Sequence, residues 1–427
     1  MKRTAIAGFA ALMMGLGAIS FAGPGNAAPG PSHIAAQIMV KFRDDAAAAG
    51  VLRRHGLGDG PGIGSTGAHL IKVPAGKELQ LVDALSRNPN IEYAEPDEVV
   101  TVAAADPDYF PRQYALHNTG QSFTNTLGTV TVPAGEPDAD VDAVEAWTKT
   151  TGVGITGAGI RVAVLDTGVT TDNSDISANV VARANFSDSA PPAGADLVDY
   201  YGHGTHVAGI IAATKDGAGV SGVCPDCDIL DGKVLNNEGS GSTSSIAKGI
   251  SWAVDNGARV INMSLGQRVS SRTLENAVND AWKKGVVIVA AAGNAGTQAK
   301  IYPGAYPNVI AVAATDNRNA KASFSTFGKW VDIAASGVSV YSTFPKHPFA
   351  LGGPGGRSEG YDIASGTSMA SPIVAGVAAL VWSTPAGTAN SSVRAKVESS
   401  ANEKIDGTGT YWANGLVNAC DAVDCVR

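Results

Sequence analysis

The sequence predicts an α/β protein with a mostly parallel β-sheet and helices on both faces, preceded by a small α+β domain. From about residue 105 onward, short apolar runs alternate with segments whose apolar residues recur at helical spacing. Parallel strands need such crossover segments, and the helices then cover both faces of the sheet. Residues 34–100 contain a separate, shorter pattern of strands and helices.

The first residues have the features of a secretory signal peptide. Lys2 and Arg3 precede an apolar run that three glycines interrupt, and small residues follow it. A membrane anchor would need about 20 apolar residues and a stop-transfer flank. We therefore expect a signal peptide over 1–28, cleaved after Ala22 or Ala28, and a secreted, extracellular protein that is not held in the membrane.

Residues 34–100 are expected to form the small α+β domain. Apolar alternation predicts its strands, and helical spacing with asparagine and proline stops predicts its helices. The expected strands are 36–42, 68–76 and 91–100, and the expected helices are 44–56 and 77–90. The following stretch, 101–121, changes from small to aromatic residues, which is typical of a boundary.

Residues 105–427 are expected to form the larger α/β domain. Apolar runs predict its strands, and helical spacing that ends at glycine predicts its helices. The strands are expected within 159–168, 227–235, 258–266, 285–294, 308–315 and 330–337, and the helices within 242–257 and 271–285. Asp166, Ser264 and Asn294 follow three of these strands, at the edge where such sheets bind ligands.

The composition limits the partners of the protein. Lys and Arg number 31 and Asp and Glu number 39, so the net charge is −8, and no basic stripe is visible. Nucleic acid is therefore not an expected partner. The charge mainly favours solubility.

The four cysteines stand in two close pairs, Cys224 with Cys227 and Cys420 with Cys425. Four cysteines allow three pairings, and the spacing does not choose among them. Zinc is the alternative, but the pairs are far apart in the sequence and an exported protein meets an oxidising compartment. Disulfides are favoured, with the two local loops as the default pairing.

Three segments carry residues that could form one catalytic site. Asp166 ends an apolar strand, where a carboxylate is costly to bury unless a partner satisfies it. His203 and His206 open a helix of small residues, without the glutamate of a zinc-hydrolase motif. Ser368 begins an apolar helix, whose positive end would stabilise an oxyanion. Each segment alone has an ordinary structural explanation, but in the order Asp, His, Ser they supply an orienting group, a base and a nucleophile.

These motifs resemble those of the subtilisin-like serine peptidases. "DTG", "GHGTHVAG", "SLG", "AAAGN" and "SGTSMASP" occur in the order of that family, and the similarity, which spans nearly all of 105–427, is greatest to the thermitase branch. The resemblance implies that Ser368 is the nucleophile, that His203 is its base and that Asp166 orients His203. It implies that Asn294 and the Ser368 backbone N–H form the oxyanion hole. Four neighbouring polar residues are expected to be structural: His206, Ser365, Thr367 and Ser371.

The resemblance also implies a substrate groove between two edge segments. Glycine there would let an extended peptide pair with the backbone, and ordinary turns are the alternative explanation. The expected lining residues are Gly239, Ser240, Gly241, Ser264, Leu265 and Gly266. Ile301 stands where the family usually has a smaller residue at the floor of the main specificity pocket. This predicts a preference for medium apolar side chains over large aromatic ones.

A structural calcium site is implied in the same way, because oxygen atoms on irregular loops suit this hard cation. Asp175 and the loop 213–220 match a calcium site of the family, and an ordinary polar loop is the alternative. The expected ligands are the side chains of Asp106, Asp175 and Asp216 and the carbonyls of Thr214, Ala218 and Val220. No catalytic cofactor is expected.

The 34–100 unit resembles the inhibitor-type prosegment of these peptidases. Parallel sheets fold slowly, so a packed prosegment would template the fold as well as block the groove. We expect a monomeric serine endopeptidase that acts on proteins or peptides, is made as a zymogen and cleaves itself within 100–105. The alternatives are an inactive secreted binding protein with the same fold and an esterase, which would need a Gly-x-Ser-x-Gly turn.

Overall fold

The computed structural model describes residues 33–63, 66–98, 107–148, 155–187, 198–353, 356–402 and 405–425. The chain divides into two compact units, residues 1–103 and 104–427. The expected signal peptide, the expected processing segment and Asp106 lie outside the described residues.

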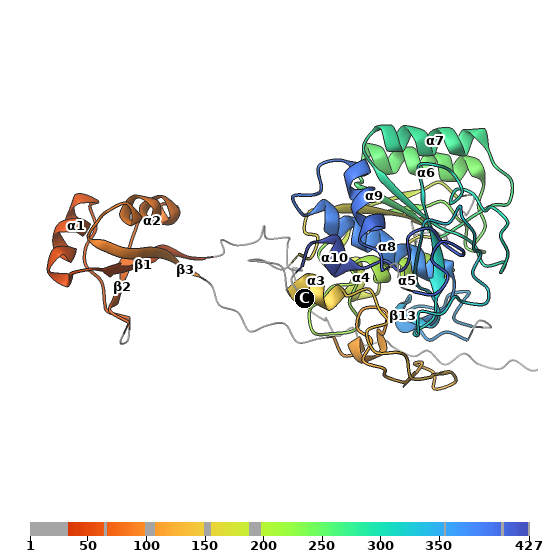
Figure 1. Ribbon diagram of the computed structural model, residues 1–427, viewed down its shortest axis with the longest axis horizontal. Helices are drawn as coiled ribbons and strands as arrows, with labels where there is room; N and C mark the ends of the chain where they lie inside the picture. The colour runs from red at the N-terminus through yellow and green to blue at the C-terminus, as the bar shows by residue number, and fades with distance from the viewer. Residues whose placement is uncertain are drawn as a thin grey trace, which may run out of the picture. The chain divides into compact units, whose positions relative to one another are not determined.

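The first unit is a small α+β domain, as the sequence predicts. Its antiparallel sheet has the order β2-β1-β3, and two helices pack with it (Figure 1). Its elements are β1 (His33–Phe42), η1 (Asp45–Ala47), α1 (Ala48–Arg54), β2 (Ala68–Lys72), α2 (Glu78–Ser86) and β3 (Ile91–Glu98). Alternating side chains of β1, Ile38 and Val40, face a core shared with Leu52, Ile71 and Leu85.

The second unit is built on one parallel sheet, which confirms the predicted fold class. In the described part of the chain its seven strands have the order β12-β11-β10-β9-β6-β8-β7. The strands are β6 (Arg161–Asp166), β7 (Val180–Asn185), β8 (Asp228–Lys233), β9 (Val260–Met263), β10 (Val287–Ala291), β11 (Ile310–Thr315) and β12 (Ile333–Ser336). Each neighbouring pair is parallel.

Alternation along the strands divides the core into two layers. In β6, Val162 and Val164 join one buried cluster, while Ala163 and Leu165 join the other. Successive strand side chains point to opposite faces, so both faces of this sheet are covered. Helices α6 (Thr243–Asp255) and α7 (Arg272–Lys283) pack together on one face, and α5 (His203–Ala212) and α8 (Thr367–Trp382) pack on the other (Figure 1).

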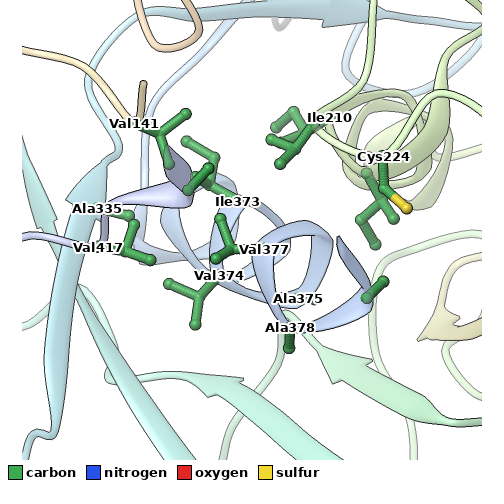
Figure 2. Packing of buried hydrophobic residues seen from close by; sticks show 14 of the residues in the cluster. Val141, Ile210, Cys224, Ala335, Ile373, Val374, Ala375, Val377, Ala378 and Val417 are labelled. Atoms are coloured by element: carbon green, nitrogen blue, oxygen red, sulfur yellow. The ribbon is translucent and has the colours of Figure 1, made fainter. Parts of the chain in front are cut away.

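Helix α8 is the central element of the larger cluster. All its residues from Met369 to Trp382 are buried, which is expected for a helix that is apolar on every side. It packs against α5 and α9 and against strands β6, β9, β10, β11 and β12 of the sheet. Figure 2 shows its side chains among Val141, Ile210 and Val417, which come from distant parts of the chain.

Several elements were not predicted from the sequence. Strand β7 lies at the edge of the sheet and is only partly buried, with Val181 exposed and Arg183 in its middle, so it lacks the apolar run of the inner strands. Strands β13 (Val340–Thr343) and β14 (Tyr361–Ala364) form an antiparallel pair, and each has only four residues. The remaining elements are η2 (Phe110–Arg112), β4 (Phe123–Thr124), β5 (Thr131–Val132), α3 (Ala143–Thr148), α4 (Ser174–Ser177), α9 (Asn390–Ser399) and α10 (Ala419–Ala422).

The cysteines form the two local disulfides that the sequence analysis took as the default. Cys224 pairs with Cys227, and Cys420 pairs with Cys425. The first pair is buried beside Gly157, where an added methyl group would overlap both sulfur atoms. Within the described residues, no helix combines the length and the apolar character needed to span a membrane.

Candidate active site

Asp166 and His203 form a hydrogen-bonded pair at the carboxyl edge of the sheet. Asp166 is the last residue of β6 and is fully buried, whereas His203 opens α5 and is partly exposed. His203 Nδ1 lies 2.7 Å from Asp166 Oδ1, which also accepts the Thr167 backbone N–H at 2.8 Å. Both bonds stabilise Oδ1 of a carboxylate that is costly to bury, while Asp166 Oδ2 has no hydrogen-bond partner among the described residues. They leave His203 Nε2 available to another group.

The imidazole of His203 binds a proton more readily in this pair than a free imidazole does in water. Burial alone would lower the pKa of His203, but the charge and hydrogen bond of Asp166, aided by the charge of Asp199, outweigh burial and raise the pKa above its ordinary value of 6.5. An imidazolium formed by proton transfer would therefore be stabilised at this position.

A buried carboxylate that the sequence analysis missed ties the start of α5 to the end of β6. Asp199 Oδ1 accepts from Thr167 Oγ1 and the Gly202 N–H, both at 2.8 Å. Its Oδ2 accepts from the Thr205 N–H at 2.9 Å, and the Gly204 N–H donates to Thr167 Oγ1 at 2.9 Å. Asp199 therefore satisfies amides at the N-terminus of the helix that carries His203. An acidic residue just before "GHGTH" was the available signal.

Ser368 is the second residue of α8, and a proline shapes its surroundings. Pro372 has no N–H, so the Ser368 carbonyl loses its usual partner inside the helix. That carbonyl accepts from Ser264 Oγ at 2.8 Å instead. Asn262 Nδ2 donates to Ser264 Oγ at 3.1 Å, and Ser371 Oγ donates to Asn262 Oδ1 at 2.6 Å. The hydroxyl of Ser371 thus has a structural partner, in line with its expected role.

The Ser368 hydroxyl donates to the Ser264 carbonyl oxygen at 3.2 Å. Among the hydrogen bonds of the described residues, none joins Ser368 Oγ to His203. One rotation about the Cα–Cβ bond of a serine changes the acceptor that its hydroxyl faces. Such catalytic hydrogen bonds are commonly long without substrate and shorten when it binds.

Two adjacent cavities connect His203 and Ser368. The first, about 380 Å³, includes His203, and the second, about 370 Å³, includes Ser368 and Asn294. Both are lined by Leu265 and Gly266, so the cavities adjoin along this segment. The structure thus brings residues from three distant parts of the sequence to one depression at the edge of the sheet.

Asn294 is held beside the start of α8. Its Oδ1 accepts the Thr367 N–H at 2.9 Å and Thr367 Oγ1 at 3.0 Å, which fixes the orientation of the amide. A methyl group on Gly366 would lie 3.3 Å from Asn294 Nδ2 and 3.6 Å from the Ser368 backbone nitrogen. Two N–H donors therefore lie around one point, and a glycine keeps that point open.

The expected groove residues line the first cavity. Gly239, Ser240, Gly241, Ser264, Leu265 and Gly266 are all among its walls. The sequence analysis missed five further lining residues: Thr167, Tyr201, Leu235, Ile246 and Gln267. Gly239 packs on the ring of Tyr201, where an added methyl group would lie 2.6 Å from the ring carbon Cζ.

Ile301 lies in the second cavity, between two glycines of its walls. A methyl group on Gly266 would overlap Ile301 Cγ2, and one on Gly293 would lie 2.9 Å from Ile301 Cγ1. The side chain of Ile301 therefore occupies the space between the two backbone segments and limits the depth of the cavity there.

His206 lies away from these cavities. It is fully buried, its Nε2 lies 3.2 Å from the Asp362 carbonyl oxygen, and its ring packs against Phe344. Burial is the main cause that lowers the pKa of His206 to about 3, so the ring is neutral. Its contacts agree with a structural role.

Three of the expected calcium ligands, Thr214, Asp216 and Val220, lie near Asp175, whereas Asp106 lies outside the described residues. Asp175 Oδ2 accepts the Val220 N–H at 2.8 Å, and Thr214 Oγ1 is buried without a partner in the described part of the chain. Burial, and then the nearby charge of Asp216, raise the pKa of Asp175. These oxygens fit a hard cation. The described residues contain no cluster of three or more His, Cys, Asp or Glu side chains that could hold a metal, so backbone carbonyls would have to complete the site.

Two family models match this chain. The subtilase family (Peptidase_S8) matches residues 157–416, which contain the Asp166–His203 pair, Asn294 and Ser368. The fervidolysin N-terminal prodomain matches residues 22–97.

Individual relatives agree with these matches. Thermitase of Thermoactinomyces vulgaris is 46% identical over 286 residues, which are 66% of this chain and 93% of that protein. A thermophilic serine proteinase of Bacillus sp. (strain AK1) is 38% identical over 398 residues, which are 92% of this chain and 88% of that protein. A solved protease structure from Pseudoalteromonas arctica has a TM-score of 0.63 and 28% identity, and covers 75% of this chain and 99% of that one.

The subtilase match spans more than half of the chain and includes the whole candidate site. The parallel sheet and the buried helix that carries Ser368 agree with it. The chain therefore belongs to the subtilase family and is a subtilisin-like serine endopeptidase with an N-terminal prodomain.

Proposed function

We propose that the protein is a secreted endopeptidase, made as a self-processing zymogen, that hydrolyses peptide bonds through an acyl-enzyme on Ser368. The observation that carries this proposal is the 2.7 Å bond between His203 and buried Asp166, at a cavity that adjoins the Ser368 cavity. An oriented imidazole beside a serine at a helix N-terminus is the arrangement that nucleophilic catalysis needs.

The proposed reaction consists of an acylation and a deacylation, and each includes two proton transfers. Ser368 Oγ attacks the carbonyl carbon while His203 Nε2 takes its proton, and Asp166 stabilises the resulting imidazolium. The peptide C–N bond then breaks as His203 returns the proton to the leaving amine. A water molecule attacks the acyl ester in the same way, and Ser368 regains its proton as the acid product leaves.

Asn294 and the Ser368 backbone N–H would stabilise the negative oxygen formed in each attack. Because the Asn294 carbonyl oxygen is held by Thr367, its amide group needs little reorganisation during the reaction. The groove walls at 239–241 and 264–266 would hold an extended peptide by backbone pairing.

Secretion and self-processing are proposed from the N-terminal sequence and the prodomain match. The basic, apolar and small-residue order of residues 1–28 favours export into an extracellular, oxidising medium, which suits both disulfides. The prodomain would act as an intramolecular chaperone and inhibitor until the chain is cut within 100–105. After signal removal we propose a monomer that acts on protein or peptide substrates.

Peptide hydrolysis tests the proposed function directly. The secreted wild-type protein should cleave an internally quenched peptide, and Ser368→Ala should remove this activity because the variant lacks the hydroxyl that attacks the substrate. Ser365→Ala is the matched control, since Ser365 is exposed and its hydroxyl accepts the Ser339 N–H. Cleavage by a purified Ser368→Ala chain at the wild-type rate would contradict the proposal, and an inactive wild type would favour a binding protein.

Loss of the Asn294 amide should slow the chemistry without unfolding the protein. Asn294→Ala is expected to lower kcat roughly 10²–10³-fold, the range that such an amide has in subtilisin, with little change in KM. The matched control is Asn308→Ala, which removes a bond to Asn279 away from the cavities. An unchanged kcat in Asn294→Ala would remove Asn294 from the oxyanion hole.

The pH profile should report the protonation of His203. Catalysis needs the neutral ring, so kcat/KM should fall as the pH drops through the pKa of His203, which lies above 6.5 because of Asp166. Asp166→Asn should move this acid limb to lower pH and slow turnover by about 10⁴. His117→Gln, at an exposed histidine, should leave the limb in place. An acid limb that Asp166→Asn does not move would contradict the assignment.

Ile301 should restrict the subsite for the residue whose carbonyl is attacked (P1). Its side chain fills the space between Gly266 and Gly293, so medium apolar side chains should be preferred over large aromatic ones. A peptide library read out at P1 checks this, and Ile301→Gly should increase cleavage after Phe and Tyr. A wild-type profile dominated by Phe and Tyr would show that the cavity is deeper than proposed.

Calcium, bound by the ligand set around Asp175, should stabilise the fold and take no part in the chemistry. On a Ser368→Ala chain, which cannot digest itself, EDTA should lower Tm; a ligand at 100 times its Kd contributes about 2.7 kcal/mol. Asp175→Asn should have a lower Tm that EDTA no longer changes. Asp280→Asn, at an exposed position of α7, should respond as the parent does. A parent Tm that EDTA leaves unaltered would exclude the site.

A further inference from the structure

The described lining of the second cavity contains one charged residue, Arg268, which has no role in the proposed catalytic scheme. Besides Arg268, its described lining consists of small or apolar residues and the uncharged polar residues Asn294, Thr367 and Ser368. Arg268 is exposed, and none of the hydrogen bonds, ion pairs or ring contacts of the described residues involves its guanidinium. Within the described part of the chain, Arg268 is therefore an exposed cationic residue of the cavity lining that has no anionic partner.

The backbone that carries Arg268 is fixed. Gln267 and Tyr302 form an antiparallel bridge in which each N–H donates to the other's carbonyl at 2.8 Å. The Gln267 side chain also donates to the Val269 carbonyl at 2.7 Å and accepts from Thr243 Oγ1 at 3.0 Å. These bonds fix the backbone from which the side chain of Arg268 extends.

The same bridge relates Arg268 to Ile301. Gln267 pairs with Tyr302 in antiparallel register. Arg268 and Ile301 are therefore the next two residues that face each other across this bridge. Both residues line the second cavity. A side chain that enters this cavity would therefore be lined by both Ile301 and the cationic residue Arg268.

We propose that Arg268 makes this subsite select acidic side chains over their uncharged isosteres, so that the enzyme cleaves after Glu faster than after Gln. The inference rests on the proposed function, because the cavity is the P1 subsite only if the carbonyl under attack lies between Asn294 and Ser368. A planar guanidinium can hold a carboxylate through two parallel hydrogen bonds, which an amide of the same shape cannot match.

Two opposing effects set the size of the preference. The net charge of −8 disfavours acidic peptides at long range, but salt screens this within about 8 Å at physiological ionic strength. Exposed ion pairs contribute little to the binding free energy, whereas charge-assisted hydrogen bonds from which water is excluded contribute more. A side chain partly enclosed by the cavity lies between these cases. We expect a Glu to Gln ratio of roughly threefold to tenfold in kcat/KM.

The test compares quenched peptides that are identical except for Glu, Gln, Lys or Leu at P1. The wild type should prefer Glu to Gln, and added salt should reduce the ratio. Arg268→Gln should bring the ratio to about one, Arg268→Lys should retain part of it, and Arg268→Glu should favour Lys over Gln. Arg272→Gln is the matched control, because Arg272 is exposed at the start of α7 and outside the cavity lining.

The outcomes separate this inference from the proposed function. A wild type that cleaves the Leu peptide but shows no preference for Glu over Gln would overturn the role of Arg268 and leave the proposed function intact. The same holds if the preference exists but Arg268→Gln leaves it unchanged. The proposed function itself would be overturned if the wild type cleaved none of the four peptides, or if Ser368→Ala cleaved them at the wild-type rate.

Discussion

The hydrogen bond between His203 and Asp166 is the interaction on which the account of this enzyme depends. The carboxylate of Asp166 is fully buried at the end of a strand, where the imidazole and the Thr167 amide stabilise its Oδ1. The same bond raises the pKa of His203 and points its other nitrogen outward. Asp199 extends the arrangement, because it holds the first turn of α5 against the end of β6.

Close packing of helices and strands brings the serine to that pair. Methyl groups on Gly204 and Gly209 of α5 would contact the Gly168 carbonyl and the hydroxyls of β13, so the small residues of "HGTHVAG" allow the helix to approach. In α8, Pro372 frees the Ser368 carbonyl for Ser264, and the neighbouring hydroxyls each have a partner. The hydroxyls of "SGTSMASP" therefore divide between that of Ser368, which lines the second cavity, and those of Ser365, Thr367 and Ser371, which have structural partners.

The sequence predicts those features that follow from periodicity and from motif order. Alternating apolar runs identify the inner strands, since both faces of the sheet are buried, whereas the partly exposed β7 lacks that signal. Asp166, His203, Asn294 and Ser368 were found as candidates through their motifs. Asp199 was missed because its partners, the Gly202 and Thr205 amides and two threonine hydroxyls, become its neighbours only in the folded chain. The rotamer of Ser368 and the place of Arg268 in the cavity lining depend on tertiary contacts, which the sequence pattern does not contain.

Covalent labelling tests the central claim that Ser368, His203 and Asp166 act as one unit. The mature enzyme is treated with a fluorophosphonate, and the modified peptide is identified by mass spectrometry as a function of time. The account predicts one adduct per chain, on Ser368, with a rate that falls at least a hundredfold in His203→Ala, roughly as general-base catalysis requires. An adduct on another serine, or equal rates in the wild type and His203→Ala, would contradict it.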